Sequence, residues 1–223
     1  MVVMATYINS LFSLMRKHYA ENWLNYLGVL LATFAVPLLF AYLSDEAYVV
    51  VALGAFVWRL ALVYVVYLTT KELRSRYKHI MATTLPVSAA ERYGFIMVNT
   101  IAVSLVIYFV CYLFSIHIAK QMLPISEESA WMLNGGIWFT NLASIVGVFN
   151  TQAILLAINL VPSRRLVVNY LVAFALFLAY HFLFLESLDV AIRGGFTFWT
   201  NIVVTLLLWV GCYMLVRKYC YKG

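Results

Sequence analysis

The sequence predicts an all-α, polytopic membrane protein with six transmembrane helices and almost no folded mass outside the bilayer. Three observations predict this class: six long apolar runs, a charged fraction of only 11%, and positive charge that falls between alternate runs. Soluble domains carry about 25% charged residues. The runs cover approximately residues 24–43, 48–68, 95–116, 137–160, 166–184 and 198–216. Each run is close to the ~20 residues that a helix needs to cross ~30 Å of hydrocarbon.

The basic residues predict the orientation of these spans. With the N-terminus in the cytoplasm, twelve of the 15 lysines and arginines lie inside, and only Lys120 and Arg193 lie outside. The inside set is Arg16, Lys17, Lys71, Arg74, Arg76, Lys78, Arg92, Arg164, Arg165, Arg217, Lys218 and Lys222. This positive-inside pattern predicts an even number of spans with both termini cytoplasmic. The net charge of +6 therefore indicates contact with anionic membrane lipids and not with nucleic acid.

Residues 1–23 precede the first span and predict an amphipathic helix at the cytoplasmic membrane interface. Its apolar residues recur at helical spacing, and the list is Ile8, Leu11, Phe12, Met15 and Tyr19. Arg16 and Lys17 occupy another face, as is typical of helices that lie among lipid head groups. A frayed terminus is the alternative. Residues 24–223 form the six-helix transmembrane domain, and the first run is read as a retained span and not as a cleaved signal.

The longest cytoplasmic stretch, about residues 71–94, predicts an elbow between the second and third spans. A basic helical extension from Lys71 is followed by Pro86, which breaks the helix. Ser88 and Glu91 then have the S-x-x-E spacing of a capping box, in which each side chain bonds the backbone N–H of the other residue. A new helix is therefore expected to start at Ser88 and to continue into the third span.

Arg59 is the sharpest exception to the apolar pattern, because it lies near the middle of the second span beside Trp58. A charge at that depth costs ~2.5–3.5 kcal/mol on insertion scales. No acidic residue lies at matching depth in any run. One interpretation is a cation that lines a cavity and meets an anionic substrate or gates the path. The other is a packing residue bonded to backbone, asparagine or tyrosine groups.

Polar and aromatic stripes follow the fourth and fifth spans. Asn141, Ser144, Gln152 and Asn159 share one helical face, whereas Asn150 faces away, and such stripes favour hydrogen bonds between helices over transport. The fifth span carries an aromatic stripe that is either packing or a binding wall. Its members are Tyr170, Phe174, Phe177 and His181.

The sequence contains no motif for catalysis or for a bound cofactor. There is no G-x-x-x-x-G-K-[ST] phosphate loop, no H-E-x-x-H and no G-x-S-x-G. The four histidines and three cysteines share no metal-ligand spacing. We therefore expect a chain that is not an enzyme and that binds no metal or cofactor itself.

The elbow carries a resemblance to a known family. The nine residues Thr84–Arg92, which read TLPVSAAER, resemble the "LPvS…E" signature between spans two and three of ABC-2 type permeases, the membrane subunits of ATP-binding cassette exporters. The layout is similar too: an N-terminal interface helix, six spans, both termini inside and a semi-apolar outer segment before the last span. The chain is short and has no large extracellular domain, so a homodimer and a pair with a sister permease both stay open.

The resemblance implies a multi-pass permease of the bacterial cytoplasmic membrane, which exports a hydrophobic or amphipathic substrate. ATP and Mg²⁺ would bind a separate ATPase subunit, and a second permease copy or a sister permease would complete the dimer. The residues that match the family's ATPase-coupling elbow are Leu85, Pro86, Ser88, Glu91 and Arg92. The residues that the resemblance places at the translocation pathway are Trp58, Arg59, Tyr170, Phe174 and Phe177. The alternative function is a non-transporting membrane sensor or assembly module.

Overall fold

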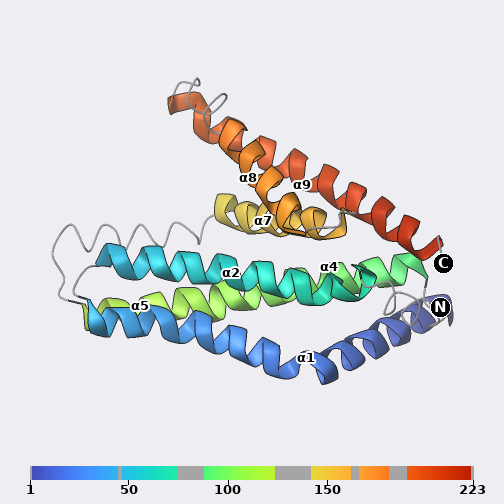
Figure 1. The fold of residues 1–223 in the computed structure, drawn as a ribbon, viewed down its shortest axis with the longest axis horizontal. Helices are drawn as coiled ribbons and strands as arrows, with labels where there is room; N and C mark the ends of the chain where they lie inside the picture. The colour runs from blue at the N-terminus through green and yellow to red at the C-terminus, as the bar shows by residue number, and fades with distance from the viewer. Residues whose placement is uncertain are drawn as a thin grey trace. The chain divides into compact units, whose positions relative to one another are not determined.

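Every element that the structure describes is a helix, which confirms the predicted all-α class (Figure 1). The computed structural model describes residues 2–44, 47–74, 88–123, 142–161, 166–180 and 190–221. The elements are α1 (Val2–Leu43), α2 (Ala47–Arg74), α4 (Ala89–Leu105), η1 (Val106–Leu113), α5 (Phe114–Met122), α7 (Leu142–Leu160), α8 (Leu166–Tyr180) and α9 (Val190–Tyr221). The element η1 is a π-helix that continues α4 into α5 without a break.

Four of the described helices are long and apolar enough to cross a membrane, as expected of an integral membrane protein. The four stretches are Phe12–Leu43, Val49–Lys71, Ala89–Met122 and Gly195–Lys218. In the part of the predicted fourth and fifth spans that the structure describes, the apolar helices are the shorter Ile145–Leu160 and Leu166–Leu176. Six spans and their orientation therefore stay predictions.

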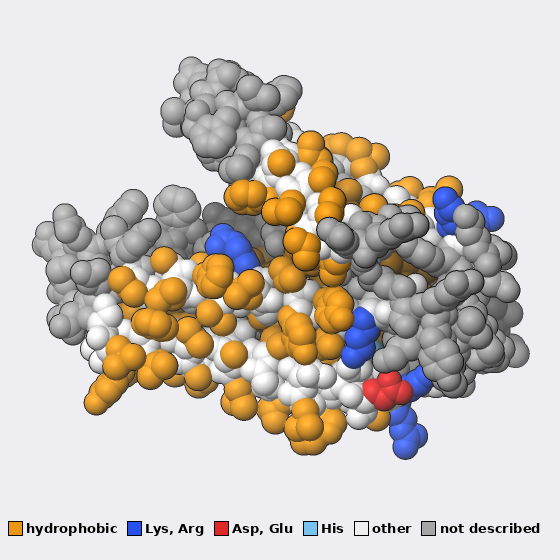
Figure 2. Space-filling view, in the orientation of Figure 1, with side chains coloured by type: hydrophobic (Ala, Val, Ile, Leu, Met, Phe, Trp, Pro, Cys, Tyr) orange, Lys and Arg blue, Asp and Glu red, His pale blue; other side chains and the backbone are white. Residues whose placement is uncertain are grey.

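Large apolar side chains are exposed along these helices. Figure 2 shows a face that is mostly hydrophobic, with few charged groups among the described side chains. Leu31 of α1, Val110 of η1 and Leu207 of α9 are each more than half exposed. Because a soluble protein rarely leaves such extended apolar surface in water, these side chains are suited to contact with lipid.

The chain divides into two compact units. The first comprises Met1–Thr69 and Phe95–Ile145, and the second comprises Thr70–Gly94 and Val146–Gly223. Within the described residues, the first unit contains α1, most of α2, η1 and α5, and the second contains most of α7 together with α8 and α9. Helix α4 contributes its first turns to the second unit and the remainder to the first.

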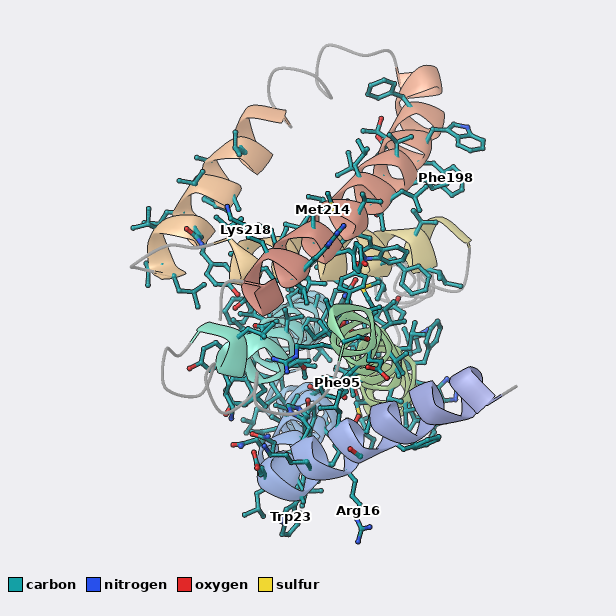
Figure 3. The ribbon with its side chains drawn as sticks, turned by 90° about the vertical axis from the view of Figure 1, so that its right-hand side faces the viewer. Arg16, Trp23, Phe95, Phe198, Met214 and Lys218 are labelled. Carbon is teal, nitrogen blue, oxygen red and sulfur yellow. The ribbon has the colours of Figure 1, made fainter. Side chains whose placement is uncertain are left out.

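Helix α1 joins the predicted interface segment and the first predicted span into one uninterrupted helix of 42 residues. No proline or glycine lies at the junction of the two segments near residues 23–24, so no residue there ends the helix. Figure 1 shows α1 changing direction along its length, and in Figure 3 Arg16 and Trp23 point away from the other helices of the unit. The continuity of α1 does not test whether residues 1–23 lie at the membrane interface, so that position stays a prediction.

The core of the first unit forms where α1, α2 and the η1–α5 segment meet. Helix α1 contacts both η1 and α5. Gly54 of α2 is buried at the closest approach, because a Cβ at that position would lie 3.0 Å from Tyr112 Cε2 and 3.1 Å from Pro37 Cγ. A glycine at this point therefore allows three helices to pack at short range.

Candidate functional site

Arg59 lies near the middle of the apolar stretch Val49–Lys71 of α2, as the sequence predicts. Either end of that stretch is about ten residues away, which corresponds to about 15 Å along a helix. An arginine side chain is too short to carry its charge that far to a membrane surface. The Arg59 side chain is also exposed on the surface of the chain. Groups close to Arg59 must therefore stabilise its positive charge.

A group of aromatic rings lies on one side of this cation, and we call Trp58, Arg59, Tyr108 and Tyr112 the Arg59 cluster. The Arg59 Cζ atom lies 5.6 Å from the centroid of the Trp58 ring, which is within the range of a cation–π interaction. The Trp58 ring in turn lies 5.1 Å from Tyr108 and 6.1 Å from Tyr112, between ring centroids. The cluster thus combines one cation on α2 with two tyrosines of η1.

The π-helix positions the two tyrosines of the Arg59 cluster. It covers Val106–Leu113, and its wider turn holds Tyr108 and Tyr112 against the same indole ring. Such π segments are rare and occur often at functional sites. The sequence interpretation missed these tyrosines, because no residue type marks a π-helix. Their i, i+4 spacing in an apolar span was the available signal.

Two polar atoms buried in this part of the first unit have no hydrogen-bond partner among the described residues. They are Trp58 Nε1 and Ser104 Oγ, and their residues are only 4% and 1% exposed. Ser104 lies one helical turn before Tyr108. A buried polar group without a partner costs about 1–3 kcal/mol. The described part of the first unit therefore contains two buried polar atoms whose hydrogen-bonding capacity is not used.

The predicted capping box is confirmed at the start of α4. The Ser88 backbone N–H donates to Glu91 Oε2 over 2.7 Å, and the Glu91 N–H donates to Ser88 Oγ over 3.2 Å. Ser88 is exposed, Glu91 is partly exposed, and Arg92 is buried. Leu85 and Pro86 lie outside the described residues. The structure therefore supports the predicted helix start, and the role of these residues in ATPase coupling stays a prediction.

Within the second unit, the first turns of α4 are bonded to α9. The Tyr93 hydroxyl donates to the Trp209 carbonyl oxygen over 2.6 Å, and the Tyr93 ring packs against Tyr213 with 5.4 Å between centroids. The Trp209 indole N–H donates to Gln152 Oε1 of α7 over 3.0 Å. These contacts form a continuous chain of side chains from α4 through α9 to α7.

The polar stripe of α7 binds neighbouring helices, as the sequence predicts. Asn159 donates to the Tyr170 hydroxyl of α8 over 2.8 Å, and Gln152 accepts from Trp209. Asn150, which was expected to face away from the stripe, donates to Asn201 Oδ1 of α9 over 3.0 Å. The side chains of Asn141 and Ser144 lie outside the described set. The described amides of this helix therefore hold α7, α8 and α9 together.

The aromatic stripe of the predicted pathway is only partly described. Tyr170 is tied to Asn159, whereas Phe174 is 61% exposed. The side chain of Phe177 lies outside the described residues, as does His181. Of the predicted pathway residues, the structure brings Trp58 and Arg59 together in the first unit, and Tyr170 and Phe174 belong to the second.

A buried polar network in the first unit joins α1, α2 and α4, and the sequence interpretation missed it. The Asn99 amide nitrogen donates to the Tyr26 hydroxyl (2.9 Å) and to Thr69 Oγ1 (2.8 Å). Its Oδ1 atom accepts from the Tyr19 hydroxyl over 2.5 Å. The Tyr26 hydroxyl lies 2.7 Å from His18 Nε2. The Tyr26 hydroxyl thus links His18 and Asn99 in one network.

The described residues contain no cluster of histidine, cysteine and acidic side chains that could hold a metal ion. Comparisons with models of protein families, with curated proteins and with solved structures give no match. The Arg59 cluster and the capped start of α4 are therefore the two candidate functional features of the described residues.

Proposed function

We propose that this chain is the transmembrane permease subunit of an ABC exporter, which moves a hydrophobic or amphipathic substrate with ATP hydrolysed on a separate ATPase subunit. The observation that carries the proposal is the capped start of α4. Ser88 and Glu91 bond each other's backbone directly after Leu85 and Pro86 in the sequence. This is the position at which the resembling family docks its ATPase.

In this proposal the chain has six spans with both termini in the cytoplasm, and it pairs with a second permease copy or a sister permease in a bacterial cytoplasmic membrane. The four apolar helices of sufficient length support membrane insertion. The distribution of lysine and arginine supports the orientation. The shorter helices α7 and α8 would supply the core of the fourth and fifth spans.

The proposed mechanism transmits ATP-driven motion through α4. Its first turns bond α9 through Tyr93, and its later turns bond α1 and α2 through Asn99. A displacement of the Ser88–Glu91 end would therefore act on the helices that these two residues contact. Transport also requires that the substrate have different affinities for the two states of the permease.

Co-purification tests the proposal directly. The full chain, isolated from its native membrane, is expected to bring with it a soluble subunit in stoichiometric amount that carries a P-loop and hydrolyses ATP. Isolation of the chain without such a subunit would instead support a non-transporting sensor or assembly module, and the permease proposal would be abandoned.

A substitution of Glu91 separates docking from helix capping. Glu91→Gln keeps the hydrogen-bonding geometry of a capping box but removes the charge. We expect the purified complex to keep its thermal stability and ATP hydrolysis and to lose transport. Glu21→Gln is the matched control, because Glu21 is an exposed acid on α1, and it should transport normally. Full coupling in the Glu91→Gln complex would contradict the docking role.

A further inference from the structure

We infer that the substrate is an anionic amphiphile whose head group binds Arg59, an inference that rests on the proposed permease function. The binding surface is the exposed side of α2, which we call the Arg59 face. Its residues are Phe56, Arg59, Leu60, Tyr64 and Tyr67. They recur at helical spacing and lie opposite the buried side of α2 that carries Trp58, Leu62 and Val65.

Hydrocarbon cannot be the partner of Arg59. The guanidinium is exposed near the centre of the apolar stretch Val49–Lys71, too far from either end to reach water. The Trp58 ring covers one side of it at 5.6 Å. Among the described residues, no group accepts a hydrogen bond from Arg59. The five N–H donors of an arginine are therefore available to a ligand.

The acidic residues of this protein do not supply the anion. None of its nine acidic residues lies between Leu24 and Leu43, or in any of the other apolar runs. The acidic residues are Glu21, Asp45, Glu46, Glu72, Glu91, Glu127, Glu128, Glu186 and Asp189. A second copy of the chain has the same distribution and brings no carboxylate to this depth. Charge complementarity therefore requires an anion from a different molecule.

The ligand of Arg59 is an amphiphile and not a small anion. Phe56 is 57% exposed and Leu60 is 51% exposed, and both lie within one turn of Arg59 on the same side of α2. Tyr64 and Tyr67 extend this apolar surface toward the end of the helix, with stacked rings 6.4 Å apart. A molecule with an anionic head and an apolar body would satisfy the cation and cover the exposed rings together, whereas an inorganic anion would leave the rings uncovered.

Equilibrium binding with a matched pair of probes tests this inference. The purified complex in nanodiscs of uncharged lipid is titrated with a fluorescent long-chain carboxylate and with its methyl ester. The two probes share the fluorophore and the chain, and the head group is charged in the carboxylate and neutral in the ester. We expect the carboxylate to bind at least about tenfold more tightly, because the charge pair forms in a medium of low dielectric. Equal affinities for the two probes would overturn the inference.

Two substitutions and one control assign the preference to Arg59. Arg59→Gln should abolish the difference between carboxylate and ester, and Arg59→Lys should keep part of it because the positive charge remains. Arg16→Gln removes an exposed cation from α1 and should leave the difference unchanged. Persistence of the full preference in Arg59→Gln would place the anion elsewhere and overturn the inference.

Transport of the same probe separates this inference from the proposed function. In inverted vesicles that contain the complex, ATP should drive accumulation of the carboxylate in wild type but not in Arg59→Gln. If another amphiphile is exported normally while the carboxylate is not, the chain is a permease and the substrate class is wrong. If the carboxylate binds at Arg59 but ATP moves no amphiphile, the occupant is a resident lipid and both the cargo assignment and the permease function fail.

Discussion

The indole ring of Trp58 lies beneath the guanidinium of Arg59, with 5.6 Å between the Arg59 Cζ atom and the ring centroid. Neighbours on a helix normally point in different directions, and here one is buried and the other exposed. The long arginine side chain folds back over the ring. This contact joins an exposed charge to the buried aromatic core formed with Tyr108 and Tyr112.

Substitutions of Trp58 should separate the contribution of the ring from that of its N–H group. Trp58→Phe keeps an aromatic ring under Arg59 and removes the unsatisfied donor, so we expect a smaller loss of stability than for Trp58→Leu. Loss of a buried aromatic side chain typically costs about 3–5 kcal/mol when it is truncated to alanine, so the leucine variant should unfold at a clearly lower temperature. Thermal unfolding of the purified protein in detergent measures the difference. Equal midpoints for the two variants would show that the ring contacts contribute little.

A matched pair of glycine substitutions tests the close packing at Gly54. A Cβ at Gly54 would lie 3.0 Å from Tyr112 Cε2, and Tyr112 is held by its contacts with Trp58 and Tyr108. Gly54→Ala should therefore destabilise the fold by about 1–3 kcal/mol through overpacking. Gly28 has no atom within 4 Å of such a Cβ, so Gly28→Ala should stabilise α1 by up to about 1 kcal/mol. Unfolding temperatures that shift in the same direction for both variants would contradict the packing at Gly54.

Replacement of Asn99 should disrupt the polar network of the first unit. Asn99→Leu removes two donated bonds and one accepted bond, and bonds between helices in membranes contribute ~0.6–2 kcal/mol each. We expect a loss of about 2–4 kcal/mol in unfolding free energy, measured by denaturant titration in detergent. The control is Asn25→Leu, which removes a single exposed bond from Tyr64 and should cost less than about 1 kcal/mol. A neutral Asn99→Leu variant would show that the network does not hold the helices.

The Ser88 hydroxyl should contribute to the stability of the α4 start. Ser88→Ala removes the acceptor of the Glu91 N–H and is expected to cost about 0.5–2 kcal/mol. Ser88→Thr keeps a hydroxyl and should be nearly neutral. Hydrogen exchange of the amides of residues 89–92 provides a local measurement. Faster exchange in the alanine variant alone is the expected result, and unchanged exchange in both would contradict the cap.

The sequence predicted those features that depend on local chemistry. The capping box follows from the spacing of Ser88 and Glu91, and the α7 stripe follows from the helical period of its amides. The position of Arg59 near the centre of α2 follows from the apolar run around it. Each of these predictions uses residues within a few turns of one another, where backbone geometry alone determines which side chains are neighbours.

The features that were not predicted depend on contacts between segments that are far apart in the sequence. The Asn99 network joins residues that are 30, 73 and 80 positions apart in the sequence, and no periodicity reveals such a match. The π-helix is missed because its residues are ordinary apolar and aromatic types that also form α-helices. Asn150 lies off the polar stripe of α7, and its bond to Asn201 was not predicted because the sequence does not show which residue of α9 it meets.

The π-helix between α4 and α5 also fixes the direction in which distant side chains point. A π segment accommodates an additional residue in its turn, so every position beyond Leu113 is rotated relative to an uninterrupted α-helix by about 100°. Deletion of one residue within Val106–Leu113 would restore the α-helical phase and turn Ser115, Ile116 and Ala119, which are buried, out of the core. The extra residue therefore determines which side of α5 is sealed against α1 and which side is left to the lipid.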